Sequence, residues 1–264
     1  MWKNAVQLEE TRLQNVRTIA DYPAFHERHR IFPAVFENRN HHKILDLSAG
    51  VGCVAERVRN NYPAFLICND ISPTCRQILH QLNLETTSFD ISQEDQSFPF
   101  FDGYFDAVIT LATIEHIIHV DHFVQEIHRI LSDTGYLYIS APNYAALLYL
   151  WRFLVRGKTF HDPLSPASRY EFYAHVRYFT YYTLREFISS FGFVLDTVYL
   201  ALPQQSTRYR ELYAGSKFKA LSYRYVMMLI YTFGSPRWSA EPVLCFRKVS
   251  QPQQDSGKLR KVVL

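Results

Sequence analysis

The stretch "KILDLSAGVG" (residues 43–52) decides how the chain is interpreted, because it joins a short apolar segment to a loop that holds Gly50 and Gly52. An apolar run that ends in such a loop is typical of the first strand of a parallel sheet that binds a nucleotide or nucleoside cofactor. Residues 50–55 (GVGCVA) also fit the pattern G-x-G-x-x-A of dinucleotide sites. The loop alone therefore leaves two classes of cofactor open.

Apolar segments of strand length recur along the rest of the chain. In the first part they alternate with amphipathic segments of helical length, a pattern that predicts a parallel sheet with helices on both faces. Continuous apolar strands such as "DAVITLA" are typical of strands buried on both sides. We predict strands at 43–47, 65–70, 86–90, 106–112, 135–142, 193–200 and 242–249.

Capping and breaking residues predict where the helices lie. Residues 5–38 are predicted to be helical, with breaks near Pro23 and Pro33. Ser72 followed by proline and Asp121 are predicted N-caps, and Thr183-x-x-Glu186 is a capping box. Further helices are expected at 52–60, in 144–180 and at 207–233, and the helix after Asp121 is expected to end near Gly135.

The predicted elements divide the 264 residues into five parts. The alternating strands and helices form a core, and the aromatic, basic stretches after it have the position of a lid over the strand ends. The expected parts are an N-terminal helical cap (1–40), a cofactor-binding core (41–143), lid insertions (144–182 and 201–240), the end of the sheet (183–200 and 241–249) and a flexible tail (250–264).

Charge is distributed unevenly along the chain. Residues 1–143 carry 11 Lys/Arg against 18 Asp/Glu, a net of −7, whereas residues 144–264 carry 17 against 7, a net of +10. The basic half is either a binding surface for an anionic partner or a surface that keeps the protein in solution. Because the basic residues are dispersed and no RNA-binding module is visible, we expect no nucleic acid partner.

The four cysteines form no Cys-x-x-Cys pair and no zinc spacing, which is typical of a reducing compartment. The polar N-terminus does not resemble a secretory signal. The apolar runs at 145–155 and 225–233 are shorter than the roughly 18 residues that a spanning helix needs. These observations predict a cytoplasmic protein that could still make peripheral contact with a membrane.

Acidic residues at three strand ends distinguish the two classes of cofactor. Asp46, Asp70 and Asp90 lie at the carboxyl ends of the first three predicted strands. A pyrophosphate is repelled by a carboxylate at this position, whereas a cofactor with cationic groups is attracted by it. S-Adenosylmethionine carries an ammonium and a sulfonium, and Asp70 is placed to accept its ribose hydroxyls and Asp90 its adenine amino group. Each aspartate alone could be a helix cap or a turn former, but a coincidence of all three is much rarer, and the set favours S-adenosylmethionine.

Several motifs in the order in which they occur resemble one known family. "ILDLSAGVG", "CNDIS", "FDIS", "FPFFDGYFDAVIT" and "EIHRILSDTGYLYISAPN" are similar to successive motifs of class I S-adenosylmethionine-dependent methyltransferases of the small-molecule (type 11) group. "HVRYFTYYTLREFISSFGF" (175–193) resembles the stretch before the sixth strand of that family. The resemblance implies a Rossmann-like, mostly parallel seven-stranded sheet with helices on both faces, an antiparallel last strand and helical lid insertions.

The resemblance also implies which residues hold the cofactor. Ser48 departs from the family's usual first glycine, but Gly50 and Gly52, where the backbone approaches the cofactor, are kept. Tyr22 and Arg28 are expected to cover the cofactor and grip its carboxylate, with an ordinary exposed helix face as the alternative. The expected cofactor-binding residues are Asp46, Ser48, Gly50, Gly52, Asp70, Ile71, Asp90, Ile91, Leu111, Tyr22 and Arg28.

Candidate catalytic residues follow the fourth strand, at the rim where an acceptor enters. Methyl transfer is an in-line displacement that needs a base only when the acceptor must lose a proton. The resemblance places "IEHI" beside the cofactor's methyl group, so Glu115 or His116 is a candidate base, and His175 is expected to face the acceptor. The alternatives are a solvated turn for the first two and a buried, satisfied histidine for the third. His119, His122 and Arg177 belong to the same rim.

Metal ligation by this rim is a weaker interpretation, because the His-Glu-x-x-His motif is absent. Glu115, His116 and His119 nevertheless offer mixed ligands. We predict a methyltransferase without a resident metal that acts on a small or lipid-linked acceptor, by O-methylation of a natural-product, glycan or quinone-like compound. The alternatives are a nicotinamide-dependent oxidoreductase and a cofactor-binding protein that acts through a partner without turnover.

Overall fold

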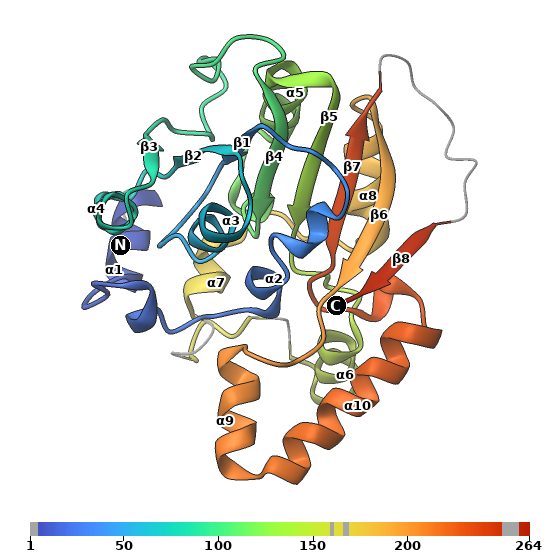
Figure 1. The fold of residues 1–264 in the computed structure, drawn as a ribbon. Coiled ribbons are helices and arrows are strands. Elements are labelled where there is room, and N and C mark those ends of the chain that lie inside the picture. The colour runs from blue at the N-terminus through green and yellow to red at the C-terminus, as the bar shows by residue number, and fades with distance from the viewer. Residues whose placement is uncertain (1–4, 159–160, 166–168, 250–258) are drawn as a thin grey trace.

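The computed structural model describes residues 5–158, 161–165, 169–249 and 259–264, and it contains one open, twisted eight-stranded sheet with helices on both faces (Figure 1). The strand order is β3-β2-β1-β4-β5-β7-β6-β8. The first five strands are parallel, and β7 is antiparallel to both of its neighbours. The strands are β1 (Lys43–Asp46), β2 (Phe65–Asn69), β3 (Glu85–Thr87), β4 (Phe105–Leu111), β5 (Leu131–Ser140), β6 (Phe193–Leu200), β7 (Val243–Lys248) and β8 (Arg260–Val263).

This architecture confirms the predicted mostly parallel sheet, but it has eight strands where the sequence predicts seven. The extra strand, β8, lies in the segment predicted to be a flexible tail, and it pairs in parallel with β6. The backbone N–H of Leu202 donates to the carbonyl of Leu264, and the side chains of Val262 and Leu264 pack on the core. Four residues, two of them basic, are too short a signal for sequence-based prediction, and this strand depends on its pairing with β6.

The strand order reverses between β1 and β4. From β1 the chain runs outward through β2 and β3 and then returns to the other side of β1. The loops after β1 and β4 therefore diverge, and in open α/β sheets such a switch point is where ligands bind. Asp46, the last residue of β1, lies beside Cys68 of β2 and Ile109 of β4. The fold thus places the loop quoted at the outset at the expected binding position.

Alternating side chains of each buried strand build two separate cores. Leu45 and Val108 face one layer, which includes α5 (Val120–Ile130) and α8 (Tyr181–Ser189). Ile44 and Ile109 face the other layer, which includes α3 (Ala55–Asn61). A strand buried on both faces needs apolar residues throughout, which explains why the strands were visible in the sequence. The helix α4 (Pro73–Gln81) begins at Ser72, whose hydroxyl accepts from the N–H of Cys75, as predicted.

Other helix boundaries differ from prediction. Residues 5–38 form only short helical pieces, because Asn15 adopts a positive φ and proline follows in two places. Helix α8 begins after Thr180, not Thr183: the Thr180 hydroxyl accepts from the Thr183 N–H at 3.2 Å, and the Thr183 hydroxyl accepts from the Thr180 N–H at 2.8 Å. Helix α5 ends at Ile130, five residues before Gly135. The N-terminal pieces are α1 (Ala5–Arg12), η1 (Ile19–Asp21), α2 (Glu27–Arg30) and η2 (Ala34–Phe36).

The two predicted insertions are helical and lie beyond the carboxyl ends of β4 and β5 (Figure 1). Among the residues that the structure describes, no helix is both long and apolar enough to cross a bilayer. Helix α9 contacts α10, and α1 contacts α7. The helices of the insertions are α6 (Leu147–Arg156), α7 (Arg169–Ala174), α9 (Thr207–Gly215), α10 (Lys217–Phe233) and η4 (Pro236–Trp238).

Candidate functional site

The loop after β1 is shaped by its two glycines. Gly50 and Gly52 have φ of +55° and +88°, a region that side-chain-bearing residues rarely adopt. A Cβ on Gly52 would lie 3.0 Å from the Leu79 side chain, so this glycine allows close packing of the loop on α4. A Cβ on Gly50 would meet nothing within 4 Å. The backbone at Gly50 therefore borders open space that a ligand can approach.

Asp70 ties the end of β2 to this loop. One of its carboxylate oxygens accepts from the N–H of Gly50 at 2.8 Å, and the other accepts from the N–H of Ser72 at 2.8 Å. The neighbouring Asn69 donates from its side chain to the carbonyl of Leu47 at 3.2 Å. The strand-end aspartate predicted from the sequence thus lies beside the glycine loop, 8% exposed.

Asp46 and Asp70 form a buried acidic pair. Burial raises the pKa of Asp46 to about 7, and the negative charge of Asp70 raises it further. Burial likewise raises the pKa of Asp70 to about 6, against the lowering effect of its two backbone hydrogen bonds. Two carboxyl groups with elevated pKa values beside an accessible loop are best stabilised by a cation. This electrostatic arrangement fits the ammonium and sulfonium of S-adenosylmethionine and disfavours a pyrophosphate.

The remaining predicted cofactor residues flank the loop with different exposure. Asp90 is exposed and lies three residues beyond the end of β3, where its carboxylate accepts from the N–H of Ser92 at 2.9 Å. Its carboxylate thus forms a turn there, and its role as acceptor for the adenine amino group stays a prediction. Ile91 is buried, and three residues are half-buried: Ser48, Ile71 and Leu111.

Tyr22 belongs to a network that covers this end of the sheet. Arg12 donates to the Tyr22 hydroxyl at 2.6 Å, and its guanidinium lies 5.0 Å from the centre of the Tyr22 ring and 5.3 Å from that of Tyr170. Glu9 accepts from both Arg12 (3.0 Å) and the Tyr170 hydroxyl (2.9 Å). Helices α1 and α7 are thereby joined. The sequence showed Tyr22 but not its partners, since these contacts span up to 161 residues.

Arg28 is buried and pairs with Glu241, which also lies 3.3 Å from Nδ1 of His26. The Nε of Arg28 is buried without a hydrogen-bond partner. The charge of Arg28 acts on both Cys53, in the glycine loop, and Glu115. The pairing of its guanidinium with Glu241 limits Arg28 as a grip for a carboxylate. Arg28 remains a predicted cofactor residue.

Glu115 lies in a short 3-10 turn, η3 (Ile114–His116), that follows β4. Ala112 precedes this turn with a φ of +52°, a strained conformation for a residue with a side chain. The carbonyl of Glu115 accepts from the N–H groups of Val176 (2.8 Å) and Arg177 (3.1 Å). These bonds hold the segment after α7 against the turn, and so bring His175 to Glu115.

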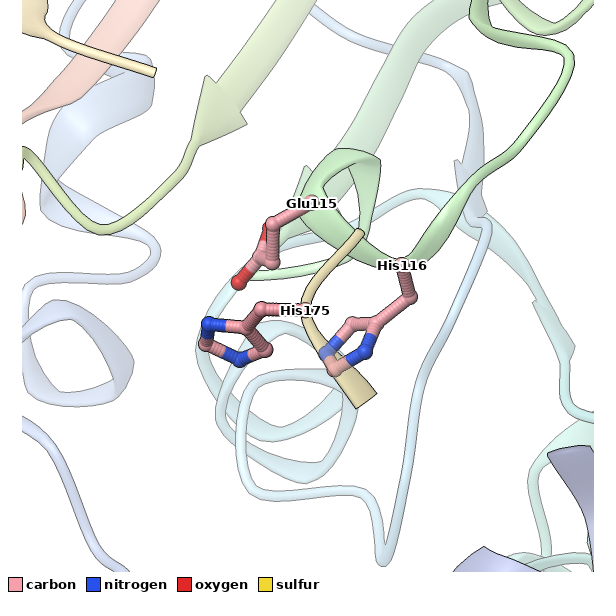
Figure 2. Close-up of side chains that lie close together, drawn as sticks. All are labelled: Glu115, His116 and His175. Carbon is pink, nitrogen blue, oxygen red and sulfur yellow. The ribbon is translucent and has the colours of Figure 1, made fainter. Parts of the chain in front are cut away.

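Glu115, His116 and His175 form a cluster at the carboxyl end of β4 (Figure 2). The carboxyl group of Glu115 points toward the His175 ring, and the two imidazole rings meet edge to face with centres 4.7 Å apart. Glu115 is 1% exposed, and neither of its carboxyl oxygens has a hydrogen-bond partner. Burial raises its pKa to about 8. The three predicted catalytic residues are thus brought together.

Both histidines of the cluster are held in one orientation. The Nδ1 of His116 lies 3.0 Å from the carbonyl of Ala174, so it carries the proton. The Nδ1 of His175 lies 2.7 Å from the Tyr144 hydroxyl, which also lies 2.9 Å from Nε2 of His161. Burial lowers the pKa of His116 and lowers that of His175 to about 3, so both rings are neutral. Tyr144 and His161 gave no motif in the sequence.

The other rim residues lie outside this cluster. His119 pairs with Glu94 at 2.6 Å, and Nε2 of His122 lies 3.1 Å from the carbonyl of Gln96. The mixed ligands that the structure groups are therefore Glu115, His116 and His175, with donor atoms within 4.8 Å of one another. Ligands of one tetrahedral zinc ion lie roughly 3.3 Å apart, so any two of these atoms near the upper bound would have to approach each other to bind an ion.

The class of protein follows from the fold and this geometry. A switch-point loop with Gly50, two buried strand-end carboxyl groups and a polar cluster after β4 together define a class I S-adenosylmethionine-dependent methyltransferase fold. A family model described as a methyltransferase domain matches residues 16–198, well over half of the chain. The chain belongs to this methyltransferase domain family, whose cofactor is S-adenosylmethionine. The family resemblance stated from the motifs is thereby confirmed.

Individual relatives are more distant. Malonyl-acyl-carrier-protein O-methyltransferase of Geobacter sulfurreducens is 30% identical over 127 residues, which are 45% of this chain and 48% of the relative. The match thus spans about half the length of that protein. A methyltransferase structure from Thermotoga maritima has a TM-score of 0.54 at 13% identity, covering 84% of this chain and 88% of that chain. The cyclase SpnF has a TM-score of 0.55 at 17% identity, covering 84% and 82%. Identities this low establish the fold alone.

Proposed function

We propose that the protein transfers the methyl group of S-adenosylmethionine to the hydroxyl oxygen of a small natural-product, glycan or quinone-like acceptor, with Glu115 as the general base. The observation that carries this proposal is the unpartnered, buried carboxyl group of Glu115 in the turn after β4, the strand that pairs with β1. A pKa of about 8 lies near a working pH, as efficient proton transfer requires. The name of the Geobacter relative, an O-methyltransferase, agrees with oxygen as the atom methylated.

The chain's own residues have distinct roles in this proposal. When bound, S-adenosylmethionine supplies an activated methyl group on a sulfonium. Asp46 and Asp70 attract its positive charge, and the backbone at Gly50 borders its position. His116 and His175, both neutral, orient the acceptor so that its oxygen lies in line with the methyl group. The acceptor oxygen forms its bond to the methyl carbon as the carbon–sulfur bond breaks, and the Glu115 carboxylate receives the hydroxyl proton.

A methyl-transfer assay with a matched variant tests the proposal. The purified protein is incubated with S-adenosylmethionine, labelled in the methyl group, and a panel of hydroxylated acceptors. Glu115→Gln is expected to lower kcat by 10²–10⁴-fold, the usual contribution of a general base, and to abolish the rise of rate toward pH 8. Glu94→Gln changes an exposed glutamate of the same rim, 64% exposed, and is expected to leave both unchanged.

Two results would contradict this proposal. An unchanged pH profile in Glu115→Gln would remove Glu115 as the base. Micromolar binding of S-adenosylhomocysteine together with no transfer to any hydroxyl acceptor would favour a protein that binds the cofactor and acts through a partner. The fold itself does not decide between these outcomes, since one structural neighbour is described as a cyclase and not as a methyltransferase. The family match already argues against the nicotinamide alternative.

A further inference from the structure

Helix α10 exposes an apolar face to solvent. Its residues 218, 221, 225, 229 and 233 recur at intervals of three or four, so their side chains lie along one side of the helix. Ala220 and Tyr231, on the opposite side, are buried against the protein. The exposed side therefore has no packing partner within the described chain. Its large exposed apolar side chains are Phe218 (80%), Leu221 (54%), Tyr225 (58%), Val226 (50%), Met228 (38%), Leu229 (38%) and Phe233 (83%).

Helix α6 repeats this feature at the same end of the molecule. Trp151 is 67% exposed and Leu154 is 76% exposed, and three neighbours in the helix are also exposed. Both helices lie beyond the carboxyl ends of β4 and β5, on the side of the candidate site (Figure 1). Exposed apolar residues scattered singly are ordinary, but two helices that expose apolar faces at one end of a protein mark an interaction surface.

The charged residues of these two helices are all basic, which favours an anionic partner. Helix α6 carries Arg152 and Arg156, helix α10 carries Lys217, Lys219 and Arg224, and neither helix contains an aspartate or a glutamate. In a symmetric dimer through this surface the basic residues of both copies would be brought together, which is unfavourable. A surface of anionic lipid headgroups complements these charges, while its acyl region accepts the apolar side chains.

We infer that α6 and α10 form a membrane-docking face, composed of the exposed apolar residues above and these five basic residues. The partner is a bilayer that contains anionic lipid, and the helices lie in its interface without crossing it. Trp151 and Tyr225 have the amphipathic rings that are enriched at the headgroup level of membrane proteins. The face lies at the same end of the sheet as the candidate site, so docking would bring that end of the molecule to the bilayer (Figure 1).

The docking face also bears on the class of acceptor. This step rests on the proposed function: if the protein methylates a hydroxyl, the acceptor would be a lipid-linked or membrane-dissolved compound that enters from the bilayer. Water-soluble acceptors would then be methylated more slowly than the same headgroup on a lipid chain. The docking face itself needs no catalysis, and its test is a binding measurement that can succeed or fail whether or not a methyl group is transferred.

Co-sedimentation with vesicles tests the face. The full chain is mixed with vesicles of phosphatidylcholine alone or with about 30% phosphatidylglycerol. The anionic lipid gives the vesicles a negative surface potential, as in natural membranes, where it is roughly −30 to −50 mV. We expect binding to the anionic vesicles only. Phe218→Ser is expected to weaken it by roughly tenfold, because an apolar side chain leaves the interface. Phe101→Ser is the matched control: Phe101 is 82% exposed but precedes β4, at the opposite end of the strand.

A charge variant separates the lipid from other occupants. Replacing Lys217 and Lys219 by glutamate is expected to lower binding to anionic vesicles by at least tenfold. Salt at about 0.5 M is expected to lower the binding of the wild type to the same vesicles, because it screens the charges. Equal loss in Phe101→Ser would overturn the inference, as would equal binding to both kinds of vesicle. A third result would also overturn it: the wild type does not bind vesicles and forms a dimer in sedimentation velocity, and Phe218→Ser dissociates that dimer. A second copy of the chain would then occupy the face.

Discussion

The carboxylate of Asp70 accepts a hydrogen bond from the backbone N–H of Gly50 at 2.8 Å, so the end of the second strand holds the loop that follows the first. The side chain that is predicted to accept the ribose hydroxyls therefore also organises the glycine loop. A carboxylate can do both because it accepts several hydrogen bonds at once. Removing its charge should accordingly affect the shape of the loop and the affinity for the cofactor together.

Asp70→Asn is expected to weaken binding of S-adenosylhomocysteine by about 10- to 100-fold. The amide of asparagine keeps one acceptor oxygen but has a donor in place of the other, and this donor faces the N–H of either Gly50 or Ser72. The variant thereby loses a hydrogen bond to a charged group, which is worth about 1.5–3 kcal/mol. Calorimetric titration measures the loss. Asp133→Asn, an 88% exposed aspartate of β5, should bind like the wild type, and equal affinities of all three proteins would exclude Asp70 from the cofactor site.

Affinity for S-adenosylmethionine is expected to rise from pH 5 to pH 8 and then to level off. The pKa values of Asp46 and Asp70 are raised to about 7 and 6, so the pair is mostly protonated at pH 5 and ionised above pH 8. Only the ionised pair attracts the cationic cofactor, so binding below pH 6 must release protons. Titration in buffers of different ionisation enthalpy measures this release. An affinity that does not change with pH would show that the pair does not face the cofactor.

The elements that were predicted from sequence are those whose signal is local. Buried parallel strands are continuously apolar, and strand-end aspartates follow from them, so β1, Asp46 and Asp70 were all found. The Arg12–Tyr22–Tyr170 network was missed because its members come from separate segments, and β8 because pairing with β6 stabilises it. The exposed face of α10 was hidden for another reason: both sides of this helix are apolar, so periodicity does not reveal which side is buried.

Glu115→Gln is expected to stabilise the unliganded protein at alkaline pH. The folded-state pKa of Glu115 is raised to about 8 from its ordinary value of 4.5, so the unfolded chain loses this proton first. Unfolding is therefore favoured increasingly as pH rises from about 4 to 8, by several kcal/mol at most. Glutamine has no proton to lose and escapes this cost. Thermal unfolding should give equal Tm values at pH 4 and a higher Tm for the variant at pH 8.5, whereas Glu94→Gln should follow the wild type at both.

Asn143→Ala is expected to destabilise the fold by about 3 kcal/mol or more, because its side chain joins three segments beyond β5: its own loop, the segment around Ser239 and the start of α8. The amide donates to the carbonyls of Arg237 and Ser239, each at 2.7 Å, and its oxygen accepts from the N–H groups of Ala145 (3.2 Å) and Tyr181 (3.0 Å). The residue is 2% exposed, so its partners would lose their bonds without regaining water, at about 1–3 kcal/mol each.

Urea unfolding of the variant measures this cost. Asn143→Asp keeps the acceptor but loses both donors, and it should be destabilised as well, since a carboxylate would face two carbonyl groups. Asn60→Ala, at an exposed position in the last turn of α3, should change the free energy of unfolding by less than about 0.5 kcal/mol. If Asn143→Ala unfolds at the same urea concentration as Asn60→Ala, these four hydrogen bonds do not hold the lid segments to the sheet. Its activity should fall together with its stability, because the same bonds fix the start of α8 and the loop that ends before Glu241.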